Sequence, residues 1–177
     1  MKQMKKIIIA TLFILLTACQ SQPETSTSAT PATSSPKETA QRNIPIVGGV
    51  ETTYVLPMKM PFHARMDTGA ETSSIDAKNI KPFERDGEKW ISFDIINRKN
   101  GETHHFEKPI KRKTGIVRSQ KSERRYVVYM KVKMGKELIN SEFTLNDREK
   151  FDYQVLVGRN IINGRFVIDP SLKNTLH

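Results

Sequence analysis

Apolar and polar residues alternate with a period of two in three segments of the chain, residues 62–66, 91–95 and 126–132. This period places successive side chains on opposite faces of a β-strand, whereas a helix repeats its apolar face every three to four residues. Helical periodicity is scarce, and only residues 158–162 favour a short helix. The pattern therefore predicts an all-β domain, either a barrel or a sandwich.

Turn signals separate the predicted strands. The Asn-Gly pair at residues 100–101 is typical of hairpins, and the Gly-containing segment 134–137 separates two further strands. A last short strand is expected at residues 165–168, ending at Asp169-Pro170 because proline interrupts a β-ladder.

Residues 1–18 resemble a lipoprotein signal peptide. Basic residues precede an apolar run from Ile7 to Leu16, which is shorter than the roughly 20 residues that cross a bilayer. The run leads into Leu-Thr-Ala-Cys, similar to the bacterial lipobox, and Cys19 is the only cysteine. We therefore expect export and lipidation of Cys19. Gln20 after the cysteine favours the outer membrane, facing the periplasm.

The rest of the chain divides into a tether and one domain. Ser, Thr and Pro dominate residues 20–43, which contain no aromatic or large aliphatic side chain. Such a segment cannot bury enough apolar area to offset its ordering entropy, so residues 19–43 are predicted to be a disordered tether. Residues 44–177 are long enough for one hydrophobic core and carry most of the formal net charge of +10.

Two motifs point to a family. The strand at 62–66 leads into Asp67-Thr68-Gly69, and an apolar run near residue 155 leads into Gly-Arg-Asn at 158–160. In this order, the two motifs resemble those of retropepsins, the single-domain aspartic proteases of retroviral type. The resemblance is closer to a bacterial retropepsin-like aspartic protease family that has carried the label of an ATP-dependent zinc protease. Its pattern extends over nearly the whole domain.

The resemblance implies a closed β-barrel with one short helix near the C-terminus, and an aspartic endopeptidase activity. It assigns a catalytic role to three residues, Asp67, Thr68 and Gly69. It assigns support of the catalytic loop and of the dimer to Ala70, Glu71, Gly158, Arg159 and Asn160, with the Glu71 carboxylate pairing with Arg159.

Peptide hydrolysis by carboxylates needs two of them sharing one proton. The chain has a single Asp-Thr-Gly motif. We therefore expect a homodimer in which each copy supplies Asp67 across a two-fold axis. Two carboxylates so close cannot both ionise readily, so the pair is expected to titrate in two separate steps.

Neither a cofactor nor a metal is expected. The sequence has no phosphate-binding loop and no His-Glu-x-x-His motif. His104 and His105 are neighbours on a probable strand and therefore point to opposite faces. A single cysteine also excludes an internal disulfide scaffold.

Residues 108–125 hold eight Lys and Arg residues and only Glu123 as an acid. By resemblance, this segment is the flap that closes over a substrate, with residues 115–117 near its tip. A basic flap favours an acidic peptide or protein as the substrate, while a solvated face or a surface for anionic lipids remains the alternative. The absence of interleaved aromatic residues disfavours nucleic acid. The expected substrate-binding residues are Arg112, Lys113, Gly115, Ile116, Val117 and Arg118.

Two other functions fit the same sequence. The fold could serve without turnover, as a peptide-binding or envelope adaptor module that grips acidic partners. A metalloenzyme is the third possibility, and only the old family label supports it.

Overall fold

The computed structural model describes residues 43–118 and 121–176, with the side chains of residues 116–124 outside the description. The described residues belong to a compact unit, residues 41–177. The predicted signal peptide, Cys19 and the tether lie outside the described residues, and the domain boundaries stay predictions. No helix among the described residues is long and apolar enough to cross a membrane.

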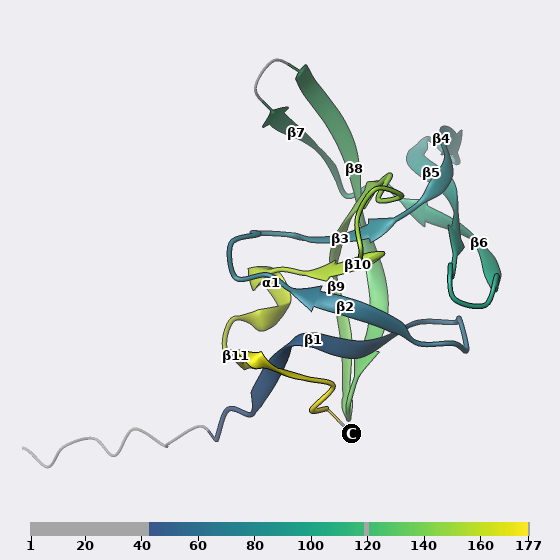
Figure 1. The fold of residues 1–177 in the computed structure, drawn as a ribbon. Helices are drawn as coiled ribbons and strands as arrows, with labels where there is room; N and C mark the ends of the chain where they lie inside the picture. Colours follow the sequence, from purple (N-terminus) through teal and green to yellow (C-terminus); the bar gives the residue numbers. More distant parts are fainter. Residues whose placement is uncertain (1–42, 119–120, 177) are drawn as a thin grey trace, which may run out of the picture. The chain divides into compact units, whose positions relative to one another are not determined.

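Six strands close into a mixed β-barrel, which confirms the predicted fold class (Figure 1). Neighbours around the barrel are hydrogen-bonded in the order β1, β2, β10, β3, β9 and β8. The ring closes where residues 53–55 of β1 pair with residues 132–134 of β8. The bounds are β1 Ile46–Val55, β2 Phe62–Met66, β3 Ser73–Asp76, β8 Lys121–Met134, β9 Glu137–Asn146 and β10 Val155–Val157.

The remaining elements attach to the outside of the barrel. β11 (Val167–Lys173) pairs with β1, and β7 (Arg112–Arg118) pairs with the first half of β8. A separate three-stranded sheet contains β4 (Lys78–Arg85), β5 (Glu88–Ile96) and β6 (Thr103–Pro109). The predicted short helix is α1 (Arg159–Ile162).

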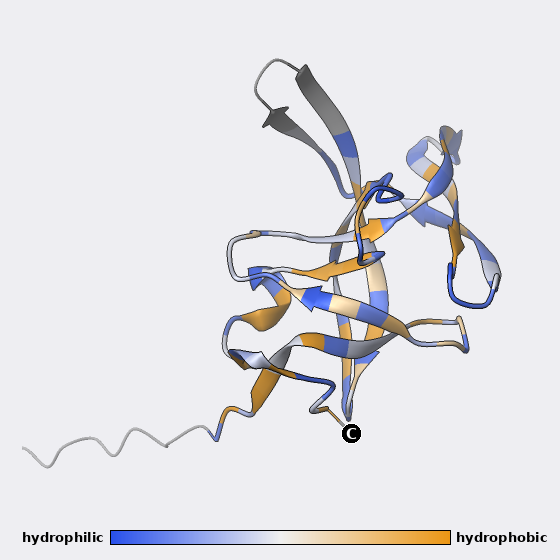
Figure 2. Ribbon diagram, viewed as in Figure 1, coloured by the Kyte–Doolittle hydropathy of each residue, from blue (hydrophilic) through white to orange (hydrophobic). Residues whose placement is uncertain are grey.

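Alternation places the core as expected. Phe62, Ala64 and Met66 of β2 are buried, while the residues between them are exposed. Apolar residues gather on the barrel strands and on α1 (Figure 2). The core continues under the small sheet, where the rings of Phe93 and Phe106 stack with centroids 5.4 Å apart.

The last strand differs from the prediction. β11 begins at Val167 and runs through Asp169-Pro170 to Lys173, rather than ending at residue 168. β11 lies at the edge of its sheet, so the missing N–H of Pro170 interrupts no ladder on its outer side. Proline therefore marks an edge strand here and not the end of a strand.

The flap also differs in detail. The segment expected to be the flap forms a long hairpin of β7 and β8 that stands out from the barrel (Figure 1). Its outermost described pair is Arg118 with Lys121, and Gly115 pairs with Arg124. Gly115 therefore lies three residues short of the end, because the ladder continues beyond the glycine that was expected near the tip.

A buried carboxylate ties the last described residues to β1. Glu51 accepts hydrogen bonds from the N–H of Gly48 at 2.6 Å, from the N–H and hydroxyl of Thr175, and from the N–H of Leu176. Its side chain is fully buried. Burial alone would raise the pKa of Glu51, but these hydrogen bonds outweigh it and the pKa lies below its ordinary value of 4.5.

Candidate active site

Asp67 stands at the end of β2, where the strand leaves the barrel. Its N–H donates to the carbonyl of Val157 at 2.9 Å, which continues the parallel pairing of β2 with β10. Its side chain is half-buried, and Thr68 and Gly69 after it are exposed. β2 therefore places the Asp67 carboxylate near the surface, and pairing with β10 fixes the backbone of this residue on one side.

Two backbone N–H groups hold this carboxylate. Oδ1 of Asp67 accepts hydrogen bonds from Gly69 at 2.9 Å and from Ala70 at 3.2 Å. A Cβ on Gly69 would lie 3.2 Å from the same oxygen, tighter than an ordinary contact, so glycine suits this close approach. These bonds leave Oδ2 without a partner among the described residues and available to a reactant. The roles of Asp67, Thr68 and Gly69 in catalysis stay predictions.

The Gly-Arg-Asn run packs directly on this loop, although it lies about 90 residues later in the chain. The N–H of Arg159 donates to the carbonyl of Ala70 at 2.8 Å, and that of Asn160 to the carbonyl of Glu71 at 3.1 Å. A Cβ on Gly158 would lie 2.9 Å from the carbonyl oxygen of Ala70. Only glycine therefore lets the start of α1 approach the loop this closely.

The side chain of Asn160 joins the loop to the barrel. Its Oδ1 accepts hydrogen bonds from the N–H of Ser73 at 2.9 Å and from the Ser73 hydroxyl at 2.8 Å. Its amide group donates to the Ser141 hydroxyl and to the Glu142 carbonyl, both at 2.8 Å. The first residue of β3 and two residues of β9 are thereby fixed by one side chain.

Arg159 supports the loop in a different way from the one expected. Its Nη1 donates to the carbonyl oxygens of Thr68 at 3.0 Å and Gly69 at 2.9 Å. In the part of the chain that the structure describes, no ion pair joins Arg159 to Glu71, which contacts α1 through its carbonyl instead. The guanidinium thus meets main-chain oxygens, because the loop curls over it.

The base of the flap touches the same loop. Arg112 donates to the Glu142 carboxylate through Nε at 3.0 Å and Nη2 at 2.8 Å, and Nη2 also reaches the Thr72 hydroxyl at 3.2 Å. Lys113 lies over the ring of Tyr126, 5.0 Å from its centroid. Arg112 and Lys113 were expected to bind substrate, and their present contacts place them at the foot of the hairpin.

The other expected flap residues lie farther out. Gly115 is exposed on β7. Ile116, Val117 and Arg118 have a described backbone on β7, but their side chains lie outside the described residues. The substrate-binding role of all four stays a prediction.

A buried charged cluster near the site was not predicted. Asp76, at the end of β3, accepts hydrogen bonds from the Arg148 N–H at 2.8 Å and from the Gln154 amide at 3.3 Å. Arg98 approaches it to 4.0 Å. Burial lowers the pKa of the Arg148 guanidinium, and the Asp76 carboxylate opposes that shift. All four residues of strand 73–76 are buried, and the last of them is charged. This charged residue in place of an apolar one is the one sequence signal that could have indicated the cluster.

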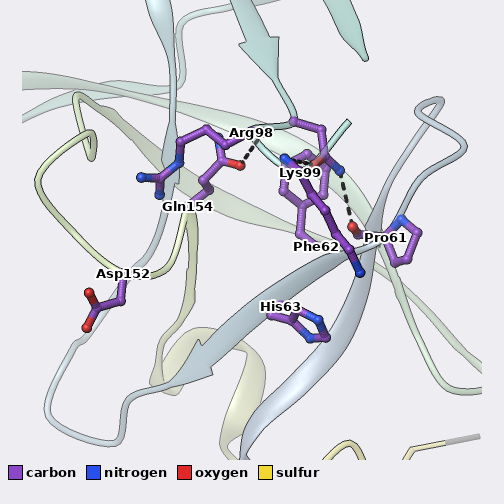
Figure 3. A pocket seen from close by; sticks show the side chains of 8 residues that line it. Pro61, Phe62, His63, Arg98, Lys99, Asp152 and Gln154 are labelled. Carbon is purple, nitrogen blue, oxygen red and sulfur yellow. Dashed lines mark hydrogen bonds between the residues drawn. The ribbon is translucent and has the colours of Figure 1, made fainter. Parts of the chain in front are cut away.

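Two pockets lie along β2. The first, about 320 Å³, is lined by Arg65, Met66, Asp67 and Thr68 together with residues of β1 and β11. The second, also about 320 Å³, is drawn in Figure 3 and includes His63, Lys99 and Asp152. Hydrogen bonds within its lining run from Asn97 to the Pro61 carbonyl and from the Arg98 N–H to Gln154 (Figure 3).

Among the described residues, no three His, Cys, Asp or Glu side chains come together in a group that could hold a metal ion. His104 and His105 lie on β6 and differ in their contacts. The His104 ring meets Phe106 edge-on at 4.5 Å, and Nδ1 of His105 lies 2.6 Å from an Asp94 oxygen. Their rings therefore occupy opposite faces of the strand, as predicted.

Comparison with known proteins gives one family. The family model described as "Retropepsin-like aspartic endopeptidase RimB", of the RimB-like family, matches residues 46–176. A solved structure from Legionella pneumophila, a protein of unknown function (DUF785), superimposes with a TM-score of 0.64 at 28% sequence identity. The match covers 75% of this chain and 98% of the Legionella chain.

Curated relatives contain a similar segment within longer chains. The protein named "Probable alpha-L-glutamate ligase" of Desulfotalea psychrophila is 36% identical over 137 residues, which is 74% of this chain and 29% of the relative. The protein of the same name from Shewanella pealeana is 34% identical over 130 residues, 71% of this chain and 28% of the relative. The chain thus spans less than a third of the length of these relatives.

Proposed function

The chain belongs to the RimB-like family of retropepsin-like aspartic endopeptidases, and we propose that it hydrolyses peptide bonds with two Asp67 carboxylates, one from each copy in a homodimer. The observation that carries the proposal is that the surrounding backbone fixes the position of the Asp67 carboxylate. One carboxylate oxygen accepts two backbone N–H groups, and the Gly-Arg-Asn run braces the loop from behind. A side chain so positioned is preorganised for reaction.

The proposed reaction uses the pair as base and acid. One Asp67 carboxylate removes a proton from water while the water oxygen bonds to the carbonyl carbon of the substrate. The other, protonated Asp67 donates its proton to the carbonyl oxygen. The tetrahedral intermediate then breaks at its C–N bond as a proton passes to the departing nitrogen. No metal or cofactor takes part in these steps.

An acidic peptide suits the charge of the protein. Lys111, Arg112 and Lys113 are exposed at the foot of the hairpin that stands out from the barrel. The longer relatives that contain a similar segment carry the name "Probable alpha-L-glutamate ligase", which names glutamate. We therefore propose peptides rich in glutamate as the substrate class, with attraction by the basic hairpin as the physical reason.

We also propose that the protein acts in the cell envelope. The signal-peptide pattern of residues 1–18 and the position of Cys19 support this location. A lipid anchor at Cys19 and the tether of residues 19–43 would leave the domain free to meet peptides near a membrane.

Cleavage assays with a matched pair of proteins test the proposal. The purified full chain and its Asp67→Asn variant are incubated with a glutamate-rich peptide from acid to neutral pH, and sedimentation measures the oligomeric state. We expect a dimer, cleavage by the native protein and none by the variant. Cleavage that survives Asp67→Asn would contradict the proposed mechanism. Binding of the peptide without cleavage by either protein would support the adaptor module instead.

A further inference from the structure

The pocket next to Asp67 contains a second ionisable side chain that the proposed reaction does not use. The lining includes Arg65, Asp67 and Thr68 from β2 and its loop, and Ile168 and Pro170 from β11. Gly49 of β1 and Met66 complete it. The pocket thus places one arginine beside the carboxylate, on a floor that is otherwise mostly apolar.

The strand geometry fixes where Arg65 lies. Residues 63, 65 and 67 occupy the outward face of β2, and Arg65 is exposed. Its backbone is held on both sides, opposite Val50 of β1 and Leu156 of β10. Alternate residues of a strand are about 7 Å apart. A substrate whose scissile bond lies at Asp67 therefore presents its neighbouring residues to Arg65.

Arg65 differs from the other arginines of the site in having no partner among the described residues. Arg112 is bonded to Glu142 and Thr72, and Arg159 to two loop carbonyls. Arg148 is buried and bonded to the Tyr153 carbonyl. Arg65 makes no hydrogen bond or ion pair within the described range, so its guanidinium is available to a ligand.

We propose that Arg65 determines specificity by binding the carboxylate of an acidic side chain close to the scissile bond. This inference rests on the proposed function and names the residue that would select the substrate. A guanidinium suits the task because its planar donors can hold a carboxylate with two parallel hydrogen bonds.

The proposed dimer gives this selection a distinctive form. A two-fold axis through the Asp67 pair places one Arg65 on each side of the scissile bond. The preference for an acid should therefore occur at two substrate positions, one before and one after the bond. General attraction by the basic hairpin would instead depend on total charge and not on position.

The test uses pairs of peptides that differ only in having Glu or Gln at one position. The rest of each peptide is neutral, and the varied position is moved in turn over three residues on each side of the scissile bond. For the full chain, kcat/KM gives the Glu-to-Gln ratio at each position. Arg65→Gln should lower the ratio about tenfold or more at the two preferred positions, and Arg65→Glu should invert it. Arg165→Gln, an equal loss of charge at an arginine that does not line this pocket, should leave the ratios as they are.

A binding measurement keeps the inference separate from the proposed activity. In the Asp67→Asn background, the affinity for the Glu and Gln peptides is compared with and without Arg65→Gln. Loss of the Glu preference in this pair supports the role of Arg65 even if the native protein cleaves nothing. Unchanged ratios in Arg65→Gln, or an equal weakening of both peptides together with loss of the dimer, would overturn the assignment.

Discussion

The side-chain amide of Asn160 makes four hydrogen bonds, and two of them reach the strand that follows the Asp67 loop. Ser73, which donates these two bonds to Asn160 Oδ1, is fully buried. Its hydroxyl also accepts the N–H of Gly158 at 3.0 Å. Loss of the Asn160 side chain would therefore leave the buried N–H of Ser73 without this acceptor and remove the side-chain link between α1 and β3.

Asn160→Ala is expected to reduce the free energy of unfolding by about 2–4 kcal/mol, because a buried donor loses its acceptor and a network loses its centre. Chemical denaturation measures the change. Asn140→Ala, the same substitution at an exposed position of β9, is the control and should alter stability by less than about 0.5 kcal/mol. Equal stabilities for the two variants would show that the Asn160 network carries little free energy.

Glu51 predicts a dependence of stability on pH. Its pKa in the folded protein is lowered below the ordinary value of 4.5, so its stabilising contribution is complete above about that pH. The contribution is lost as the pH falls through the lower folded pKa, because the folded and unfolded states are then both protonated and no longer differ in bound protons. Stability should therefore fall on acidification below about pH 4.5.

Glu51→Gln tests this dependence. The variant should be less stable at neutral pH and should lack part of the acid-induced fall, as measured by denaturation across the pH range. Glu137→Gln, at an exposed position of β9, serves as the control. A native-like acid profile in Glu51→Gln would mean that other carboxylates produce the fall.

Sequence reasoning identified some of these residues and missed others for a physical reason. Asp67 and Arg159 belong to short motifs that resemble those of retropepsins, so the resemblance indicated them. Asp76 and Arg148 are 72 positions apart and meet only in the folded barrel. Arg148 lies in a polar segment and looks like a surface residue in the sequence, and the only local signal for Asp76 is a charge in place of an apolar residue.

At the scale of elements, the foot of the β7–β8 hairpin is joined to the Asp67 loop by Arg112. Its contacts with Glu142 and Thr72 link three segments that are distant in sequence. Loss of these contacts should therefore loosen β7 at the base of the hairpin.

Arg112→Ala should raise amide hydrogen exchange in β7 about three- to tenfold, because a partly exposed ion pair and one further hydrogen bond are lost. Mass spectrometry of exchanged peptides measures it. Arg85→Ala removes a similar exposed pair with Glu107 on the small sheet and should leave β7 unchanged. Equal exchange in β7 for Arg112→Ala and the native protein would remove Arg112 from this role.

Elements with strong alternation were predictable, and those fixed by tertiary contacts were not. β2 and β5 follow their apolar pattern, with Phe62, Ala64 and Met66 and with Ile91, Phe93 and Ile95 buried. β3 is buried on all four residues, Ser73–Asp76, and so shows no alternation. β11 passes through a proline because only one of its edges is paired. In both cases the neighbouring strands determine the structure.

At the scale of the whole molecule, the proposed activity requires two copies. Each single chain holds one Asp67 loop, and Thr68 is exposed beside it. Arg159 shapes this exposed surface by bonding to the carbonyls of Thr68 and Gly69. The order of the loop should therefore influence the strength of the dimer.

Arg159→Gln should raise the dissociation constant of the dimer at least tenfold, since each copy loses charged hydrogen bonds to the loop that meets its twin. Analytical ultracentrifugation over a range of concentrations measures it. The control is Arg165→Gln, in which an arginine that bonds to the Ile161 carbonyl is lost outside the Asp67 loop. A monomeric native protein at all concentrations would contradict the dimer itself.

The continuity of β8 has a mechanical consequence. Its 14 residues form one strand from the hairpin to the seam where the barrel closes on β1. Strand β9 pairs with the same strand over residues 127–134. If the hairpin binds a peptide as we propose, β8 transmits the load directly into the barrel wall, because β9 pairs with it over residues 127–134 and β1 over residues 132–134.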